Sequence, residues 1–85
     1  MEIKLEVPEY NPNIGIKYNW QMGFEIEVQY KDDIVLLKAN KAGLISLANH
    51  LLNLAQDEIP LGHHLHFDEN NSLEEGSVDL IIQKE

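Results

Sequence analysis

The chain has 85 residues, with fifteen acids against six lysines, no arginine and no cysteine, so its formal charge is −9. A chain of this length buries only about 60–65% of the surface of its unfolded form, so we expect a single domain, residues 1–85, with one core. The excess of acids disfavours nucleic acid and anionic membranes as partners, because both attract clustered basic side chains, and the lack of cysteine excludes disulfides and thiolate metal sites.

Three stretches in the first part of the chain alternate apolar and polar side chains, which is the pattern of a strand with one buried face. They are Glu2–Val7, Ile14–Trp20 and Phe24–Tyr30, and turn-forming residues separate them. Ile34–Ala39 follows the third stretch after Asp32-Asp33, and this spacing predicts a tight antiparallel hairpin.

The period changes after Asn40, where apolar residues begin to recur at spacings of three and four and so predict a helix with one buried side. Asn40 is suited to cap the N-terminus of this helix. Pro60 disfavours helical geometry at Ile59, so we expect the helix to end near Gln56 or Asp57. The residues expected on its buried side are Leu44, Ile45, Leu47, Ala48, Leu51, Leu52, Leu54 and Ala55.

Two further strands, His63–Asp68 and Val78–Gln83, are expected on either side of a polar loop. The predicted fold class is α+β, with a mainly antiparallel sheet of about five or six strands and one long helix packed on one face. The order is four strands, the helix and two strands. The face of the sheet that the helix leaves open would then be acidic, with histidines set into it.

The last but one strand raises the question of a metal site. His64, His66 and Asp68 point to the same side of a strand, and imidazole nitrogens beside a carboxylate suit zinc or another divalent ion. A complete site needs further ligands, and neither His50 nor any particular acid is an obvious one. We therefore predict no metal and no other cofactor, with these three residues as the candidates if a metal binds.

Catalysis is not predicted either. No Gly-x-Ser-x-Gly turn is present, and one helix on one sheet offers no deep pocket for acid–base chemistry. Met1–Lys4 lacks the layout of a signal peptide, and no apolar run approaches the roughly 18 residues that span a bilayer, so we expect a soluble, cytoplasmic protein that is not an enzyme.

Several motifs in Asn40–Lys84 point to one family. They are Gly43-Leu44, Leu47-Ala48 and Leu51-x-x-Leu54-Ala55 in the helix, Gly62-His63-His64-x-His66 in the next strand, and Leu73-x-x-Gly76-Ser77 before the last strand. In these motifs the chain resembles the immunity protein 32 family of bacterial polymorphic-toxin systems. The resemblance implies a small cytoplasmic protein that binds and neutralises a cognate toxin and has no catalysis of its own.

An acidic surface would complement a basic protein partner such as a cationic toxin, and inhibition would then be by occlusion. We predict that the contact surface includes Glu25, Glu27, His64, His66 and Asp68, although the resemblance assigns none of them a role. Two alternatives stay open. One is a metal-binding or hydrolytic protein that uses His63–His66, and the other is a small structural or oligomerisation domain, for which a homodimer through an unpaired edge strand is possible.

Overall fold

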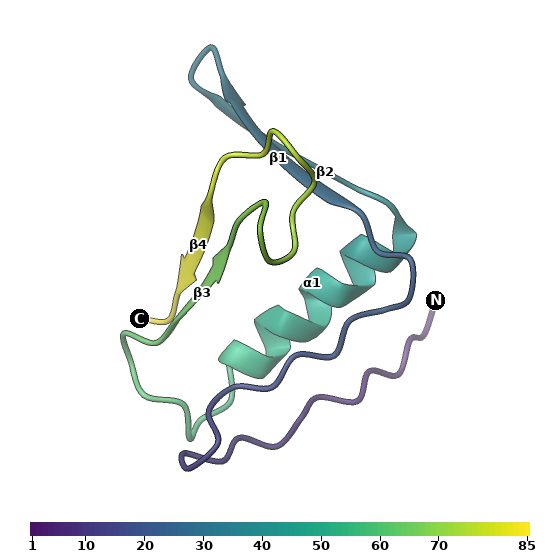
Figure 1. Cartoon of the computed structure of the whole chain (residues 1–85). Coiled ribbons are helices and arrows are strands. Elements are labelled where there is room, and N and C mark those ends of the chain that lie inside the picture. The colour runs from purple at the N-terminus through teal and green to yellow at the C-terminus, as the bar shows by residue number, and fades with distance from the viewer.

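The computed structural model describes residues 1–85 and contains one helix and four strands (Figure 1). In chain order they are β1 (Ile26–Lys31), β2 (Ile34–Ala39), α1 (Lys41–Leu54), β3 (His64–Phe67) and β4 (Leu80–Gln83). The α+β class is as predicted. The prediction of one sheet of five or six strands is wrong, because β1 and β2 form one antiparallel pair and β3 and β4 form another.

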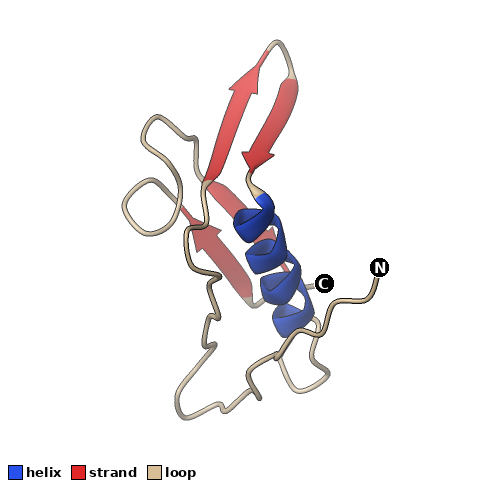
Figure 2. Cartoon of the chain, turned by 90° about the vertical axis from the view of Figure 1, so that its right-hand side faces the viewer, coloured by secondary structure: helices blue, strands red, loops and turns tan.

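The β1–β2 hairpin projects from the rest of the molecule (Figure 2). Its turn consists of Asp32 and Asp33, whose φ angles of 54° and 62° are both positive, as a type I′ turn requires. Aspartate tolerates this left-handed geometry better than most other residues that carry a side chain. Lys31 lies opposite Ile34 at the closed end of the ladder, so the antiparallel hairpin predicted from the sequence is confirmed.

The two hairpins are joined through residues 74–78, which run along the edge of β1 that β2 does not occupy. The N–H groups of Glu74 and Val78 donate to the carbonyl oxygens of Ile26 and Val28, each at 2.8 Å. The Val28 N–H in turn donates to the hydroxyl of Ser77 at 3.1 Å. Irregular chain thus takes the place of a further strand beside β1, and the outer edge of β2 is the edge of this hairpin that stays unpaired.

The core lies between α1 and the two hairpins. In β3 and in the first half of β1 the predicted alternation holds, because every second side chain is buried while Glu27, His64 and His66 point away from the core. Tyr30, near the end of β1, departs from it and is 59% exposed. In β2, by contrast, no side chain is buried. The eight buried apolar side chains are Ile26, Val28, Leu47, Leu54, Ile59, Leu65, Phe67 and Leu73.

The first 24 residues form no strand, so the predicted strands Glu2–Val7 and Ile14–Trp20 are wrong. This N-terminal segment instead makes two irregular passes beside α1 (Figure 1). An extended chain must still satisfy its main-chain polar groups. Here several of them bond to side chains of the helix and not to a neighbouring strand.

Four polar side chains at spacings of three and four residues make these bonds, and we call Ser46, Asn49, Asn53 and Gln56 the polar ladder. Gln56 lies just beyond the last turn of α1. The Ser46 hydroxyl accepts from a main-chain N–H at 2.8 Å, and the two asparagines donate to carbonyl oxygens at 3.0 and 2.5 Å. The main-chain partners are Gln21 N–H, the Glu6, Pro8 and Lys17 carbonyls, and Tyr10 N–H.

Because the polar ladder faces inward, α1 is rotated relative to the predicted orientation. Leu47 and Leu54 reach the core as expected, but Leu44, Leu51 and Leu52 are 55%, 49% and 52% exposed. The leucine stripe predicts a helix correctly and its buried side wrongly, since polar side chains that bond to main-chain groups are buried in place of leucines. With 14 residues, α1 is also too short to cross a membrane, and no other helix is present that could.

The predicted N-cap is confirmed and has a second role. The Asn40 side-chain oxygen accepts the N–H of Gly43 at 2.8 Å, which is a capping bond, and also the N–H of Glu25 at 3.0 Å. Its amide donates to the Gly23 carbonyl at 2.9 Å. One side chain therefore fixes the start of α1 against the chain that enters β1. The helix ends at Leu54, slightly earlier than expected.

Gly43 lies where α1 approaches β1 closely, and replacing it with alanine should be costly. An added Cβ would lie 2.5 Å from the carbonyl oxygen of Glu25 and 2.9 Å from Cγ1 of Ile26. Overpacking against main chain outweighs the better helix propensity of alanine, so we expect Gly43→Ala to lower the free energy of unfolding in urea by about 2 kcal/mol. The reverse exchange at an exposed helix position, Ala48→Gly, should cost about 1 kcal/mol through propensity alone. A Gly43→Ala variant with wild-type stability would contradict the close approach.

Candidate functional site

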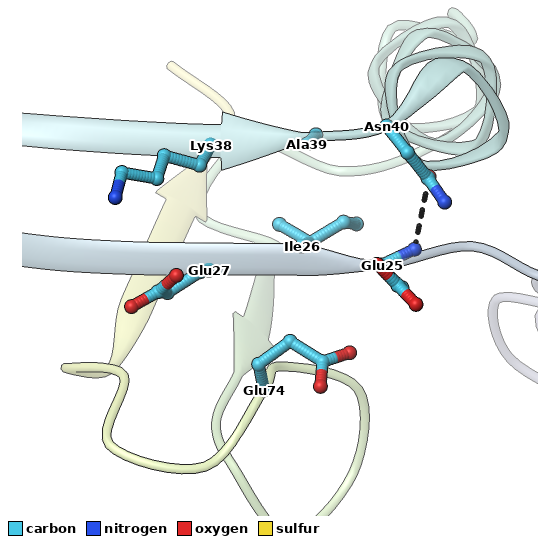
Figure 3. Close-up of a pocket in the computed structure, with 7 residues that line it drawn as sticks. All are labelled: Glu25, Ile26, Glu27, Lys38, Ala39, Asn40 and Glu74. Atoms are coloured by element: carbon cyan, nitrogen blue, oxygen red, sulfur yellow. Dashed lines mark hydrogen bonds between the residues drawn. The ribbon is translucent and has the colours of Figure 1, made fainter.

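Three glutamates gather where β1 begins (Figure 3). Glu25 immediately precedes β1, Glu27 lies within it, and Glu74 comes from the segment that runs along its edge. We call these residues the glutamate cluster. With Lys38 and Asn40 they line a depression of about 190 Å³. Lys38 lies opposite Glu27 in the hairpin but forms no ion pair, so the three carboxylates leave the depression with a negative charge.

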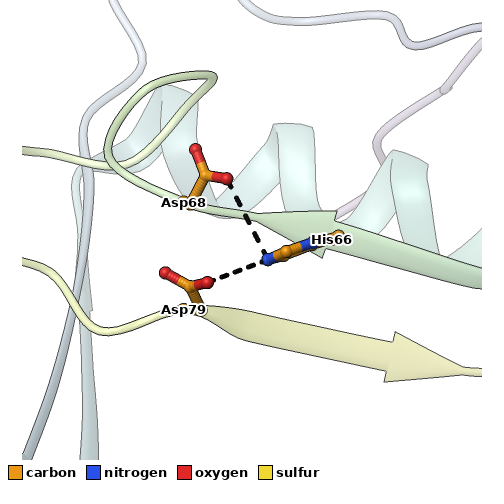
Figure 4. Close-up of side chains that lie close together, drawn as sticks. All are labelled: His66, Asp68 and Asp79. Carbon is orange, nitrogen blue, oxygen red and sulfur yellow. Dashed lines mark hydrogen bonds and ion pairs between the residues drawn. The ribbon is translucent and has the colours of Figure 1, made fainter.

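A second cluster lies on the other hairpin (Figure 4). Nε2 of His66, in β3, is 3.0 Å from Oδ2 of Asp79, which directly precedes β4, and 4.0 Å from Oδ2 of Asp68. We call His66, Asp68 and Asp79 the histidine cluster. Two carboxylates outnumber the single imidazole, so this surface carries a net negative charge.

The Asp68 carboxylate also shapes the loop that follows β3. Its Oδ1 accepts the N–H groups of Asn70 and Asn71 at 2.9 and 3.1 Å, an arrangement that closes an Asx turn. The Asn71 side chain returns two bonds, accepting the N–H of Asp68 and donating to the carbonyl of His66, each at 3.0 Å. The histidine cluster is thus held at the start of a well-bonded loop.

The predicted contact residues do not form one group in the structure; they are Glu25, Glu27, His64, His66 and Asp68. Two lie in the glutamate cluster, two lie in the histidine cluster, and His64, although exposed on the same side of β3, belongs to neither. His63 is half-buried, with its ring 6.2 Å from that of Tyr10 in an edge-on contact. The sequence analysis missed Glu74 and Asp79. Alternation along β4 was a signal for Asp79, whereas the place of Glu74 depends on an irregular segment that no pattern reveals.

One short segment contributes to both clusters. Residues 74–79 supply Glu74 to the glutamate cluster and Asp79 to the histidine cluster. The five Cα–Cα steps between these two residues span at most about 18 Å. The bonds of this segment to β1 fix it between them. The Cα atoms of Glu74 and Asp79 are therefore at most about 18 Å apart, and we call the two clusters together the acidic region.

The histidine cluster has donors that would suit a divalent cation, with one nitrogen and two oxygens all within 4.8 Å of one another. Relative to the predicted candidates, Asp79 takes the place of His64. The side chains of His66 and Asp79 are 45% and 63% exposed and already bond to each other, as surface ion pairs commonly do without a metal. The geometry gives no further ligand that would complete a structural zinc site.

His50, the fourth histidine, lies in the interior and away from both clusters. Its ring is fully buried among aromatic side chains, with centroids 5.2 Å from Tyr18, 4.3 Å from Trp20 and 5.9 Å from Phe67. Neither ring nitrogen has a hydrogen-bond partner. Burial penalises the charged form and lowers the pKa of His50 to about 4, so this ring is neutral at pH 7 and belongs to the core.

Comparison with known proteins agrees with the motifs found in the sequence. The family model of immunity protein 32 matches residues 34–85, which is more than half of the chain. The chain belongs to the immunity protein 32 family. No curated protein and no solved structure matches it. In this immunity protein the matched region begins with β2 and contains the histidine cluster and Glu74, whereas β1 and the N-terminal segment precede it.

Proposed function

We propose that this protein neutralises a cognate bacterial toxin in the cytoplasm by covering the surface through which that toxin acts, with no catalysis of its own. Membership of the immunity protein 32 family supports a toxin as the partner. The acidic region formed by the glutamate and histidine clusters is the observation that supports a cationic surface on that toxin. A toxin whose cleft holds phosphate groups would present such a surface.

The charge of the protein favours this mode of binding. A formal charge of −9 on 85 residues speeds encounter with a cationic partner, and local complementarity selects the partner. Because the bonds of segment 74–78 and of the Asx turn fix both clusters, little side-chain and loop order has to be created on binding. His64, exposed beside the histidine cluster, completes the proposed contact surface.

Charge reversal at the centre of this surface tests the proposal. We expect Glu74→Lys to weaken binding of the cognate toxin domain at least about tenfold, because it replaces an attraction by a repulsion at the contact. Glu9→Lys makes the same change in net charge on an exposed residue of the N-terminal segment and should have a small effect. Titration calorimetry against the cognate toxin domain, sought among the neighbouring genes, measures both affinities.

Two results would reject the proposal. Equal loss of affinity in both variants would show that net charge matters and the acidic region does not. Absence of binding between the two purified wild-type proteins would remove the toxin as the partner. Circular dichroism of each variant separates a lost contact from a lost fold.

A further inference from the structure

A small pocket with an aromatic wall adjoins the histidine cluster. Its volume is about 150 Å³, which is room for one side chain of a partner and not for a larger ligand. We call it the aromatic pocket, and Tyr18 in its wall is 41% exposed. The residues that line it are Tyr18, Trp20, His66, Phe67, Asn71 and Ser72.

The aromatic wall is held in place from the interior. The ring of Trp20 stacks on that of Phe24 with centroids 4.3 Å apart, and it meets the ring of His50 edge-on at the same distance. The ring of Tyr18 makes edge-on contacts with His50 at 5.2 Å and with Phe67 at 6.5 Å. The buried ring of His50 thus supports both Tyr18 and Trp20. The pocket is formed before a partner arrives, so little side-chain order has to be created on binding.

The charges beside the aromatic pocket are negative. Two of its lining residues contact Asp68, since Nε2 of His66 lies 4.0 Å from Oδ2 and the N–H of Asn71 donates to Oδ1 at 3.1 Å. His66 also bonds to Asp79 at 3.0 Å (Figure 4). No lysine lines the pocket, and Lys17, next to Tyr18 in the sequence, lines a different depression. The pocket therefore favours a cation.

An arginine side chain fits this combination better than a lysine. The face of a tyrosine or tryptophan ring attracts a cation, and the planar guanidinium of arginine can stack on such a ring while its N–H groups donate to carboxylates. The Ser72 hydroxyl donates to the Asn71 side chain and keeps lone pairs that can accept a further hydrogen bond. A guanidinium is also more weakly hydrated than an ammonium group, so less hydration is lost when it enters the pocket.

We propose that the aromatic pocket binds an arginine side chain of the toxin, with its guanidinium stacked on Tyr18 and paired with the carboxylates of the histidine cluster. This inference rests on the proposed function for the identity of the partner. Aromatic residues and arginines seated in pockets supply much of the binding energy of protein interfaces. Tyr18 and Trp20 precede residues 34–85, the range that matches the family model, so this contact adds the N-terminal segment to the binding surface.

Replacement of the Tyr18 ring gives the first test. We expect Tyr18→Leu to raise the dissociation constant for the toxin domain at least about tenfold, because it keeps an apolar side chain and removes the ring face. Tyr18→Phe keeps a ring and should change the constant less than about threefold. Tyr30→Leu makes the same exchange at an exposed tyrosine of β1 and should bind as the wild type does. Titration calorimetry measures all three variants.

A charge placed in the opposite wall tests the pocket without touching its aromatic rings. Ser72→Lys puts a cation where the guanidinium would bind, so it should also weaken toxin binding at least about tenfold. Asn13→Lys adds the same charge at an exposed position of the N-terminal segment and should have a small effect. Circular dichroism shows whether each variant is folded, and the two substitutions in the pocket affect different segments of the chain.

The fluorescence of Trp20 reports on the pocket without the toxin, because this residue is the only tryptophan of the chain. We expect titration with N-acetylarginine amide to change the emission of the wild type. N-acetylcitrulline amide has nearly the same shape and no charge, so it should have little effect. The response to the arginine amide should be weaker in Tyr18→Leu than in Tyr18→Phe.

Three outcomes would overturn the proposal. Wild-type affinity for the toxin in folded Tyr18→Leu and Ser72→Lys, with affinity lost in Glu74→Lys, would remove the pocket from the contact and leave the proposed function standing. Equal responses of Trp20 to the arginine and citrulline amides would show that the pocket does not select a cation. Absence of toxin binding by the wild type would reject the proposed function and this inference together.

Discussion

Replacing Asn53 with leucine is expected to lower the free energy of unfolding by about 3 kcal/mol, because it leaves buried polar groups without partners. Asn53 is 1% exposed and is the third of the four members of the polar ladder. Its amide donates to the Lys17 carbonyl at 2.5 Å, and its oxygen accepts from the amide of Gln56 at 2.7 Å. Leucine has the same branched side-chain skeleton as asparagine and leaves no cavity, so the lost bonds dominate the change.

The destabilisation should be local to the N-terminal segment. We expect hydrogen exchange and proteolysis in residues 5–20 to accelerate in Asn53→Leu more than in β1 or β3, because the N-terminal segment bonds to the polar ladder and not to a sheet. Asn70→Leu, at an exposed loop position, should change stability by less than about 0.5 kcal/mol. Asn53→Leu with wild-type stability in urea would show that these bonds contribute little.

Mild acid is expected to destabilise the protein through His50. Its pKa is about 4 in the folded state and 6.5 in the unfolded chain, so between these values the unfolded chain binds more protons. The stability due to the neutral ring is complete above pH 6.5 and is lost as the pH falls toward 4. A shift of this size corresponds to roughly 3 kcal/mol at most.

Comparison with His50→Phe isolates this effect from the titration of the acids. Phenylalanine keeps an aromatic ring among Tyr18, Trp20 and Phe67 and removes two unpartnered nitrogens, so the variant should be more stable at pH 7 and lose less stability on acidification. His64→Phe removes an exposed imidazole and should keep the wild-type slope. Urea unfolding at several pH values measures all three proteins, and parallel slopes for wild type and His50→Phe would exclude His50 as the acid-sensitive group.

The elements predicted most accurately are those whose signals are local. The Asp32-Asp33 turn with alternating residues on both sides identified the hairpin, and Asn40 ahead of a changed period identified the start of α1. The N-terminal strands failed because alternation indicates an extended chain with one buried side and does not tell what bonds to its main chain. The orientation of α1 failed for the same reason, since its burial of asparagine depends on that distant partner.

In the candidate site too, the features with a local sequence signal were predicted and those that depend on distant segments were not. Glu25, Glu27, His64 and His66 are exposed or half-exposed on the predicted side of their strands, because period-2 alternation fixes the side. Which of these side chains lie close together in a cluster depends on segments of the chain that have no periodic pattern. The loop that carries Glu74 to β1 is an example, and residue types alone do not indicate such a path.

The polar ladder has a consequence for how this protein tolerates change. Through it the helix holds residues 6–21 by main-chain carbonyl and N–H groups, which every residue type except proline offers. Residues of the N-terminal segment that point to solvent can therefore be exchanged without loss of its hydrogen bonds to the polar ladder. One side of the molecule can change its chemistry in this way while the packing beneath it is preserved.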